Sequence, residues 1–445
     1  MKEQQSIKHK HITSFQIIIL GFLFLIVLGS LLLMLPIATK DGEGAIFSDA
    51  IFTATSAVCV TGLVVRDTAT YWSMFGQGVI LFLIQIGGMG IVTVAVAATS
   101  LSGRKIGLMQ RSTMQEAVSA HHVGGIVRLT KFILKTTVVI EFLGAALLCP
   151  IFIRDFGING IWYSIFHSVS AFCNAGFDLM GVKGQFSSLT TYYSNPFVNI
   201  VIMALIIIGG IGFLTWEDIK NNKFHFRKYR MQSKVILSVT VILIVVPAVY
   251  FFFLEYFNLP LGERILTSLF QSVTPRKAGF NTTDLSKFSE TGQMMTLLLM
   301  LTGGAPGSTA GGMKITTVAV LVSSALSVFL RKEKTHFFKR RISDETVKSA
   351  ATIFLMYIAL FIGGGMIISR IENIPLLSSL FETASAIGTV GLSLGVTTGV
   401  GIVSQLILIV LMFFGRVGGL TLIFAATKAM NTGEKKYPQE KITVG

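Results

Sequence analysis

The chain has 445 residues, of which 52% are hydrophobic and only 13% are charged, and its mean hydropathy is +0.71. Soluble proteins carry about 25% charged residues, so this composition excludes a soluble enzyme. A formal charge of +15 would by itself be compatible with nucleic-acid binding. In a membrane protein, however, the position of the charges relative to the apolar segments decides what they mean.

Several uncharged runs follow one another along the chain, and each exceeds the roughly 20 apolar residues that cross a bilayer. We therefore predict an all-α integral membrane protein. The first run lacks a small-residue cleavage site after its apolar core, so we expect it to be retained as a helix. The runs cover residues 12–39, 73–103, 184–216, 235–254, 291–313 and 383–415.

The charges alternate in sign between successive connecting segments. One set holds 25 Lys and Arg residues against nine acids, and it covers residues 1–14, 101–131, 217–234, 331–348 and 428–445. The other set holds nine basic residues against twelve acids, and it covers residues 36–72, 154–195, 255–293 and 370–398. The positive-inside rule places the first set, with both termini, in the cytoplasm of a multi-pass cell-membrane protein.

One short pattern recurs four times on the predicted outer side, as an apolar segment that ends in a glycine loop. The four glycines are Gly62, Gly176, Gly279 and Gly391, at intervals of 114, 103 and 112 residues. The preceding segments, 46–57, 160–171, 264–274 and 376–386, are too short to cross and too apolar for solvent. We predict that each enters the membrane and returns as a re-entrant half-helix.

Long apolar segments flank each copy, so the repeating unit is predicted to be helix, re-entrant pore half-helix with filter loop, helix. Four units give eight full spans around one central pore. The units cover residues 12–100 (pore loop 46–66), 131–220 (pore loop 160–180), 234–330 (pore loop 264–284, intramembrane loop 303–314) and 347–430 (pore loop 376–395), with cytoplasmic termini at 1–11 and 431–445.

Irregular backbone at membrane depth is tolerated where it is buried in protein or lines an aqueous cavity, so the four loops are expected to converge on one axis. Their carbonyl oxygens could replace the hydration shell of a monovalent cation. Close packing of helices is the alternative for any single glycine, but four in register favour a filter. The predicted filter residues are Val58, Cys59, Val60, Thr61, Gly62, Phe172, Cys173, Asn174, Ala175, Gly176, Arg276, Lys277, Ala278, Gly279, Ile387, Gly388, Thr389, Val390 and Gly391.

The third inner segment is predicted to break, because glycine and proline do not sustain a helix. The break is either a structural kink or a flexible loop that impedes ions. Arg416 lies inside an apolar segment, where an arginine costs at least about 2.5 kcal/mol, so it needs compensating partners. Glu141 is also mid-span, and its role stays open between packing and ion coupling. The candidate gate comprises Gly303, Gly304, Pro306, Gly307, Gly311, Gly312, Lys314 and Arg416.

These motifs resemble the Trk/Ktr/HKT superfamily of potassium transporters, most closely its KtrB-type membrane subunits, over nearly the whole chain. The resemblance implies potassium uptake through a channel-like pore, with the broken helix and Arg416 as a barrier under the filter. It also implies a homodimer and a separate cytosolic ring-forming regulatory subunit that binds ATP or ADP. Lys277 departs from the family, whose third loop commonly has a smaller polar residue here.

Other functions stay open at this stage. An alternating-access cation carrier and a sodium-selective member of the same superfamily are the alternatives, whereas an enzyme would need a catalytic dyad or metal cluster that the spans lack. We expect no cofactor, potassium as the substrate, and sodium dependence as an open question. Because charges on the axis would repel the ion, Arg276 and Lys277 are predicted to point behind the filter, with Arg276 bracing it through hydrogen bonds.

Overall fold

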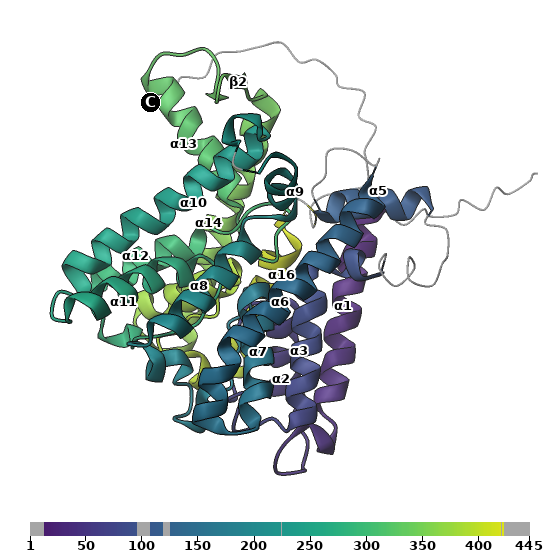
Figure 1. Ribbon diagram of the computed structural model, residues 1–445, viewed down its shortest axis with the longest axis vertical. Coiled ribbons are helices and arrows are strands. Elements are labelled where there is room, and N and C mark those ends of the chain that lie inside the picture. The colour runs from purple at the N-terminus through teal and green to yellow at the C-terminus, as the bar shows by residue number, and fades with distance from the viewer. Residues whose placement is uncertain (1–12, 96–106, 119–124, 224, 420, 422–445) are drawn as a thin grey trace, which may run out of the picture.

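The computed structural model describes residues 13–95, 107–118, 125–223, 225–419 and 421, and almost all of its secondary structure is helical (Figure 1). Strands are limited, among these residues, to one antiparallel hairpin, in which β1 (His336–Phe337) pairs with β2 (Arg340–Arg341). The predicted all-helical class therefore holds for the part of the chain that the structure describes.

Four long apolar helices form the outer helices of the repeats. Thr13 and Gln16 close a capping box at the start of the first, and Ser343 caps the last through the backbone N–H of Thr346. All four are long and apolar enough to cross a membrane. In the most apolar stretch of each helix, fewer than half of the residues are buried inside the protein. They are α1 (Ser14–Leu33), α6 (Ile126–Phe156), α10 (Met231–Tyr250) with the π-turn η5 (Phe251–Glu255), and α14 (Asp344–Glu372).

Each outer helix packs against a short helix that follows it. These helices have 12 to 15 residues, or about 18–22 Å at 1.5 Å per residue, against a hydrocarbon core of about 30 Å. Their bounds lie within three residues of the half-helices expected from the sequence. They are α2 (Phe47–Val58), α7 (Asn159–Cys173), α11 (Leu261–Val273) and α15 (Leu376–Gly388).

The inner helices are interrupted in all four repeats, whereas the sequence predicted a break only in the third. A glycine with positive φ ends the helical run in three of them: Gly90 (84°), Gly212 (91°) and Gly418 (88°). In the second repeat the chain bends by 97° at this point. The elements are α3 (Met74–Met89), α8 (Pro196–Gly210) with α9 (Phe213–Asn222), α12 (Glu290–Leu301) with α13 (Ile315–Phe329), and α16 (Ile402–Val417).

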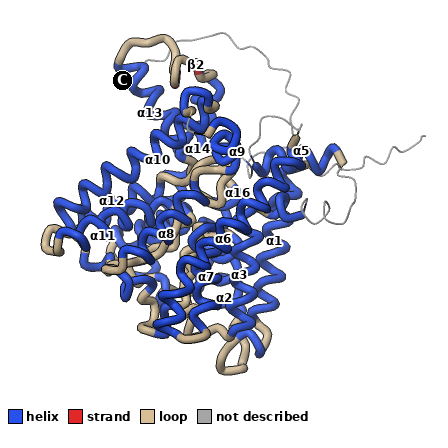
Figure 2. Tube along the Cα trace, in the orientation of Figure 1, coloured by secondary structure: helices blue, strands red, loops and turns tan. Residues whose placement is uncertain are grey.

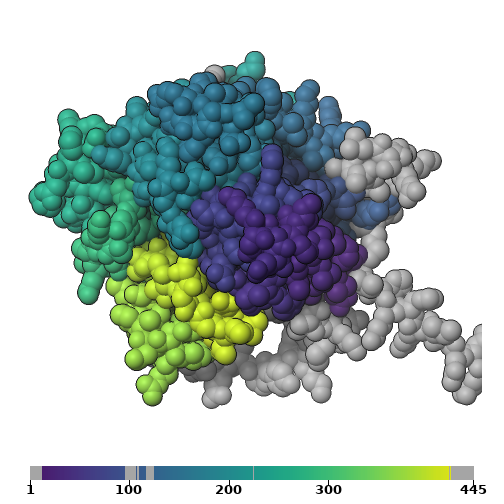
Figure 3. Space-filling model, turned by 90° about the horizontal axis from the view of Figure 1, so that it is seen from below, coloured from purple at the N-terminus to yellow at the C-terminus, as the bar shows by residue number. Residues whose placement is uncertain are grey.

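The four repeats close into a ring. The inner helix of each repeat packs against the half-helix of the next, in the pairs α3 with α7, α8 with α11, α12 with α15, and α16 with α2. Figure 3 shows the four parts of the chain in sequence order around one centre. The half-helices and their loops therefore lie innermost, where buried residues such as Phe52, Phe172, Phe270 and Phe381 form the core.

Short elements connect the repeats. Among them, α5 (Leu108–Val118), the end of α9 and the β-hairpin lie at one end of the molecule (Figure 2). These elements contain described basic residues of the segments that the positive-inside rule assigns to the cytoplasm, among them Arg111, Lys220, Arg340 and Arg341. The remaining connections are the short helices η1 (Pro36–Ala38), η2 (Met180–Val182), η3 (Ser188–Tyr192), η4 (Phe226–Lys228), η6 (Thr274–Arg276), η7 (Leu285–Lys287) and η8 (Thr397–Gly399).

Candidate functional site

The glycines that end the four loops lie in a closed ring. Gly62 is next to Gly176, Gly176 to Gly279, Gly279 to Gly391, and Gly391 to Gly62. A Cβ built on any of them would lie 2.9–3.2 Å from the Cα of the next glycine and would press on the carbonyl oxygen that precedes it. All four have positive φ, between 71° and 93°. Both the conformation and the close approach therefore require glycine here.

Hydroxyl groups at the base of each loop hold this geometry. In the first and fourth loops, Ser56 and Ser385 accept a hydrogen bond at 3.0 Å from the backbone N–H of the ring glycine. In the second, Ser170 Oγ donates to the Phe177 carbonyl at 2.6 Å. In the third, Thr274 Oγ1 donates to the Phe280 carbonyl at 2.8 Å. Sequence reasoning missed these residues, although the recurring serine at the start of the repeated pattern was the available signal.

Two buried pore-helix side chains in equivalent positions anchor the chain beyond the ring. His167 lies nine residues before Gly176, and its Nε2 accepts the Leu179 N–H at 3.3 Å. Glu382 lies nine residues before Gly391 and accepts the Leu394 N–H at 3.0 Å, together with the hydroxyls of Ser393 and Thr397. The third residue after each of these two glycines is thus held by the helix that precedes it.

A cavity of about 320 Å³ lies on the outer side of the ring, and all four glycines line it. Asp67 and Asp178 contribute its acidic side chains. Asp67 accepts hydrogen bonds from the backbone N–H groups of Ala69 (3.1 Å), Thr70 (2.8 Å) and Phe186 (2.9 Å), the last from the second repeat. The entrance to the ring from this side therefore carries carboxylates and no basic side chain among the described lining residues.

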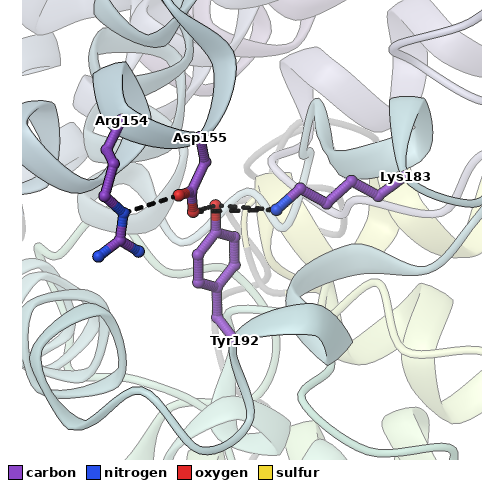
Figure 4. A network of polar contacts seen from close by, with 4 residues as sticks. All are labelled: Arg154, Asp155, Lys183 and Tyr192. Atoms are coloured by element: carbon purple, nitrogen blue, oxygen red, sulfur yellow. Dashed lines mark hydrogen bonds and ion pairs between the residues drawn. The ribbon is translucent and has the colours of Figure 1, made fainter.

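An ion-pair network closes the outer rim of the second repeat (Figure 4). Asp155, at the end of α6, accepts a hydrogen bond from Tyr192 at 2.7 Å and pairs with Arg154 at 3.0 Å. Lys183 lies 3.9 Å from the same carboxylate and 3.3 Å from the Tyr192 hydroxyl. This network joins the outer helix to the segment that follows the second loop.

Beneath the ring, the segment between α12 and α13 crosses toward two other repeats. The Ala305 N–H donates to Gly210 at 2.9 Å, and the Phe213 N–H donates to Gly307 at 2.7 Å. On the opposite side, the Gly312 N–H donates to Gly415 at 2.8 Å. The segment therefore connects the second and fourth repeats through backbone hydrogen bonds. We call residues 302–314 the intramembrane loop.

Arg416 fixes this loop to two inner helices. Its Nη1 donates to the Thr309 carbonyl at 2.5 Å, and its Nη2 donates to the carbonyls of Gly88, at 3.0 Å, and Gly87. The guanidinium thus binds carbonyls at the end of α3 and in the broken third inner segment, and the Gly87 carbonyl also accepts the Gly90 N–H at 3.2 Å. Lys314 Nζ donates to Ala310 at 2.7 Å within the loop.

A second cavity of about 320 Å³ lies on the inner side of the loop. Gly307, Gly312, Lys314 and Arg416 line it, together with Gly88 and Gly90 at the end of α3. The ring and the loop consequently separate an outer cavity with two acidic side chains from an inner cavity whose lining includes Lys314, Arg416 and one acid, Glu116.

Arg276 and Lys277, the two charged residues of the third loop, are both buried. Arg276 is buried, yet its Nε has no hydrogen-bond partner among the described residues, so the expected bracing through this atom is absent. Both residues line a small pocket against Ile206 and Ile207 of α8 and Thr240 of α10. The Nζ of Lys277 reaches the Gly388 carbonyl at 2.5 Å and lies beside Gly303 and Gly312 of the intramembrane loop.

Glu141 sits behind the second half-helix, at the contact between the first and second repeats. Its carboxylate accepts a hydrogen bond from Gln85 Nε2 at 3.1 Å, and the Cys173 thiol lies 3.9 Å away. Ser168 donates to its backbone carbonyl at 2.6 Å. The carboxylate is 9% exposed and has polar partners, which is the requirement for a mid-span acid.

Comparison with known proteins agrees with this architecture. A crystal structure of the potassium transporter TrkH from Vibrio parahaemolyticus superposes with a TM-score of 0.73 at 20% identity, covering 96% of this chain and 87% of that one. The potassium/sodium uptake protein NtpJ of Enterococcus hirae is 40% identical over 98% of both chains. The Ktr system potassium uptake protein B of Bacillus subtilis is 37% identical over the full length of both.

The sequence profile of the TrkH family, described as cation transport proteins, matches residues 1–436. The relatives are membrane transporters of potassium and sodium, not enzymes. With a profile match over almost the whole chain and relatives at 37–40% identity, this chain belongs to the TrkH family of cation transport proteins.

Proposed function

We propose that this protein takes up potassium across the cell membrane through a channel-like pore formed by its four repeats. The observation that carries the proposal is the closed ring of four glycine loops between an outer and an inner cavity. Irregular backbone is stable in a membrane where it lines an aqueous path, and the ring is the point at which all four repeats meet. The interrupted inner helices complete eight crossings in this proposal.

The ring selects the ion through backbone carbonyls. Each loop offers the carbonyls of the residues before its glycine, and no acidic side chain lies among them. Carbonyl oxygens of this kind replace the hydration shell of a monovalent cation, whereas rings of Asp or Glu are typical of other cation filters. The carboxylates of the outer cavity raise the local cation concentration at the entrance.

The intramembrane loop and Arg416 form the gate. The loop lies directly under the ring, and hydrogen bonds from Arg416, Asn174 and the Gly312 backbone hold it in place. Arg416 and Lys314 also place positive charge in the path of a cation. An ion therefore passes when the loop moves aside, which makes the loop an element with two arrangements.

Regulation in this proposal comes from a second protein, a cytosolic ring-forming subunit that binds ATP or ADP and docks on the basic end of a homodimer. The relatives named as components of Ktr systems support a multi-subunit assembly. The segments 101–131 and 428–445 follow the first and fourth inner helices, so a pull on either would reach α3 or α16. Residues 96–106, 119–124 and 422–445 lie outside the described part of the chain.

Sodium is the second ion to consider, because the Enterococcus hirae relative is named for potassium and sodium uptake. The decisive experiment is flux of ⁸⁶Rb⁺ and ²²Na⁺ into proteoliposomes at a fixed membrane potential. Saturable, potential-driven ⁸⁶Rb⁺ uptake that potassium competes with supports the proposal. Uptake of ²²Na⁺ that excess potassium does not reduce would instead establish a sodium transporter.

A further inference from the structure

Lys277 occupies an equivalent position to Val60, Asn174 and Thr389, two residues before the ring glycine. Those three residues adopt left-handed backbone conformations, with φ of 56°, 59° and 52°, whereas Lys277 is extended at 170°. The side chain of Asn174 turns down to the intramembrane loop and donates to Thr309 Oγ1 at 2.8 Å. Thr389 likewise lies against Gly311. This position therefore faces the intramembrane loop.

The side-chain nitrogen of Lys277 lies between the end of α15 and the intramembrane loop. The residue is only 2% exposed, and its Nζ donates to the Gly388 carbonyl at 2.5 Å. A Cβ on Gly303 would lie 2.6 Å from the same Nζ, and one on Gly312 would overlap it. Among the described residues no carboxylate lies within ion-pair distance of Lys277. The side-chain nitrogen thus has a backbone carbonyl, and no acid among the described residues, as its partner.

This arrangement makes the side chain chemically similar to the transported ion. An ammonium is a compact monovalent cation with three donors, and it seeks the same oxygen ligands as a dehydrated alkali ion. Gly388 is the last residue of α15, where aligned peptide dipoles concentrate negative potential. A carbonyl bonded to the ammonium is not free to coordinate a passing cation.

We propose that Lys277 is a tethered cation at the inner end of the filter, which competes with the transported ion for the Gly388 carbonyl and so sets ion affinity. The inference rests on the proposed function, because it takes the carbonyls of the fourth loop as ion ligands. It adds a specificity-determining residue to that function. An ion must displace the ammonium before it leaves the ring toward the loop.

The test compares Lys277→Thr, which installs the residue of the fourth repeat, and Lys277→Gln with wild type in detergent. The readout is the KCl concentration that gives half of the maximal thermal stabilisation, with choline chloride keeping the ionic strength constant, because an ion bound to the folded state raises Tm. We expect this concentration to fall at least fivefold in both variants. Uptake of ⁸⁶Rb⁺ at subsaturating concentration should rise in parallel.

Lys234→Gln is the matched control, because it removes an ammonium that also bonds to a backbone carbonyl, that of Arg227 at 2.7 Å, away from the ring and the intramembrane loop. Its half-saturating KCl concentration should change less than twofold. An equal shift in the control would show a general effect of charge and overturn the competition. Monodisperse Lys277 variants with wild-type potassium affinity would overturn it too.

If Lys277→Thr or Lys277→Gln does not purify as a monodisperse species, Lys277→Met takes its place, because methionine keeps most of the side-chain volume. We expect the same fall in half-saturating KCl concentration for Lys277→Met. The two levels of the proposal fail differently. A wild-type protein that neither binds potassium nor conducts rubidium contradicts the proposed function, and the inference with it. A wild-type protein that does both, with unchanged Lys277 variants, contradicts only the role of Lys277.

Discussion

The third repeat differs from the other three in two features: the contact at the end of its half-helix and the length of the break in its inner helix. In repeats one, two and four, a carbonyl at the end of the half-helix lies against a glycine near the end of the inner helix, as in the pairs Val58–Gly87 and Phe172–Gly209. In the third repeat the corresponding Gly303 lies against Lys277 and Met313. The inner helix there breaks for residues 302–314, whereas the first and second repeats break at one or two residues. All four repeats thus contribute a glycine to the ring, and the third also supplies the segment beneath it.

In the proposed function, this difference explains how one repeat can obstruct a pathway that four repeats build. Glycine where the helix meets the half-helix lets the two backbones touch, and a longer insertion at the same place frees the chain to cross the axis. The loop is then held by side chains from the other repeats, chiefly Arg416 and Asn174. The following experiments test whether the ring and the intramembrane loop have these separate roles.

Deletion of residues 307–310 should have the largest effect. It removes Thr309, whose carbonyl binds Arg416 and whose hydroxyl joins Asn174, so the obstruction loses its attachments. We expect ⁸⁶Rb⁺ uptake in proteoliposomes to rise on the order of a hundredfold, or about 2.7 kcal/mol of barrier. With the regulatory subunit present, uptake should lose its dependence on nucleotide. A variant that folds and keeps wild-type, nucleotide-dependent flux would place the gate elsewhere.

Replacement of the ring glycines by serine should have the second-largest effect. It tests whether the third repeat is equivalent to the others within the ring. A side chain on Gly62, Gly176, Gly279 or Gly391 would press on the carbonyl of the neighbouring loop and strain a positive φ. We expect each variant to reduce the preference for potassium over sodium about tenfold, or 1.4 kcal/mol. Competition of KCl and NaCl against ⁸⁶Rb⁺ uptake measures the preference. Unchanged selectivity in all four variants contradicts the assignment of the ring as the filter.

Arg416→Ala tests the link between the fourth repeat and the loop. It removes hydrogen bonds to three backbone carbonyls and one positive charge, but leaves the loop's contacts with Gly210 and Phe213. We therefore expect a partial effect, a rise in flux of about fivefold, or roughly 1 kcal/mol. Arg416→Lys keeps the charge and loses the planar set of donors. Equal flux in Lys and Ala variants would assign the barrier to hydrogen bonding, whereas wild-type flux in both would remove Arg416 from the gate.

The sequence predicted where the four short helices lie and which four glycines follow them, because each copy of the repeated pattern contains a short apolar segment and a loop that ends in glycine. It did not predict the breaks at Gly90, Gly212 and Gly418, since a packing glycine and a glycine of positive φ look alike in a sequence. The bonds from Arg416 to Gly87 and from Lys277 to Gly388 also escaped prediction. Both join residues from different repeats, and their partners are backbone carbonyls, which every residue has.

Asn174→Ala should give the smallest effect. It tests whether the Asn174 side chain holds the intramembrane loop in place or only stabilises the folded protein. The variant loses the 2.8 Å hydrogen bond between Nδ2 and Thr309 Oγ1, and a neutral hydrogen bond contributes about 0.5–1.5 kcal/mol. If that bond is present only when the loop obstructs the path, its loss should raise ⁸⁶Rb⁺ flux about two- to threefold. Asn195→Ala is the control, because Asn195 caps α8 at the outer end and its loss costs about 1 kcal/mol without touching the loop. Similar losses of Tm in both variants, with increased flux in Asn174→Ala alone, would show that the second repeat holds the loop of the third. Equal flux in the two variants would show that Asn174 contributes to stability and not to gating.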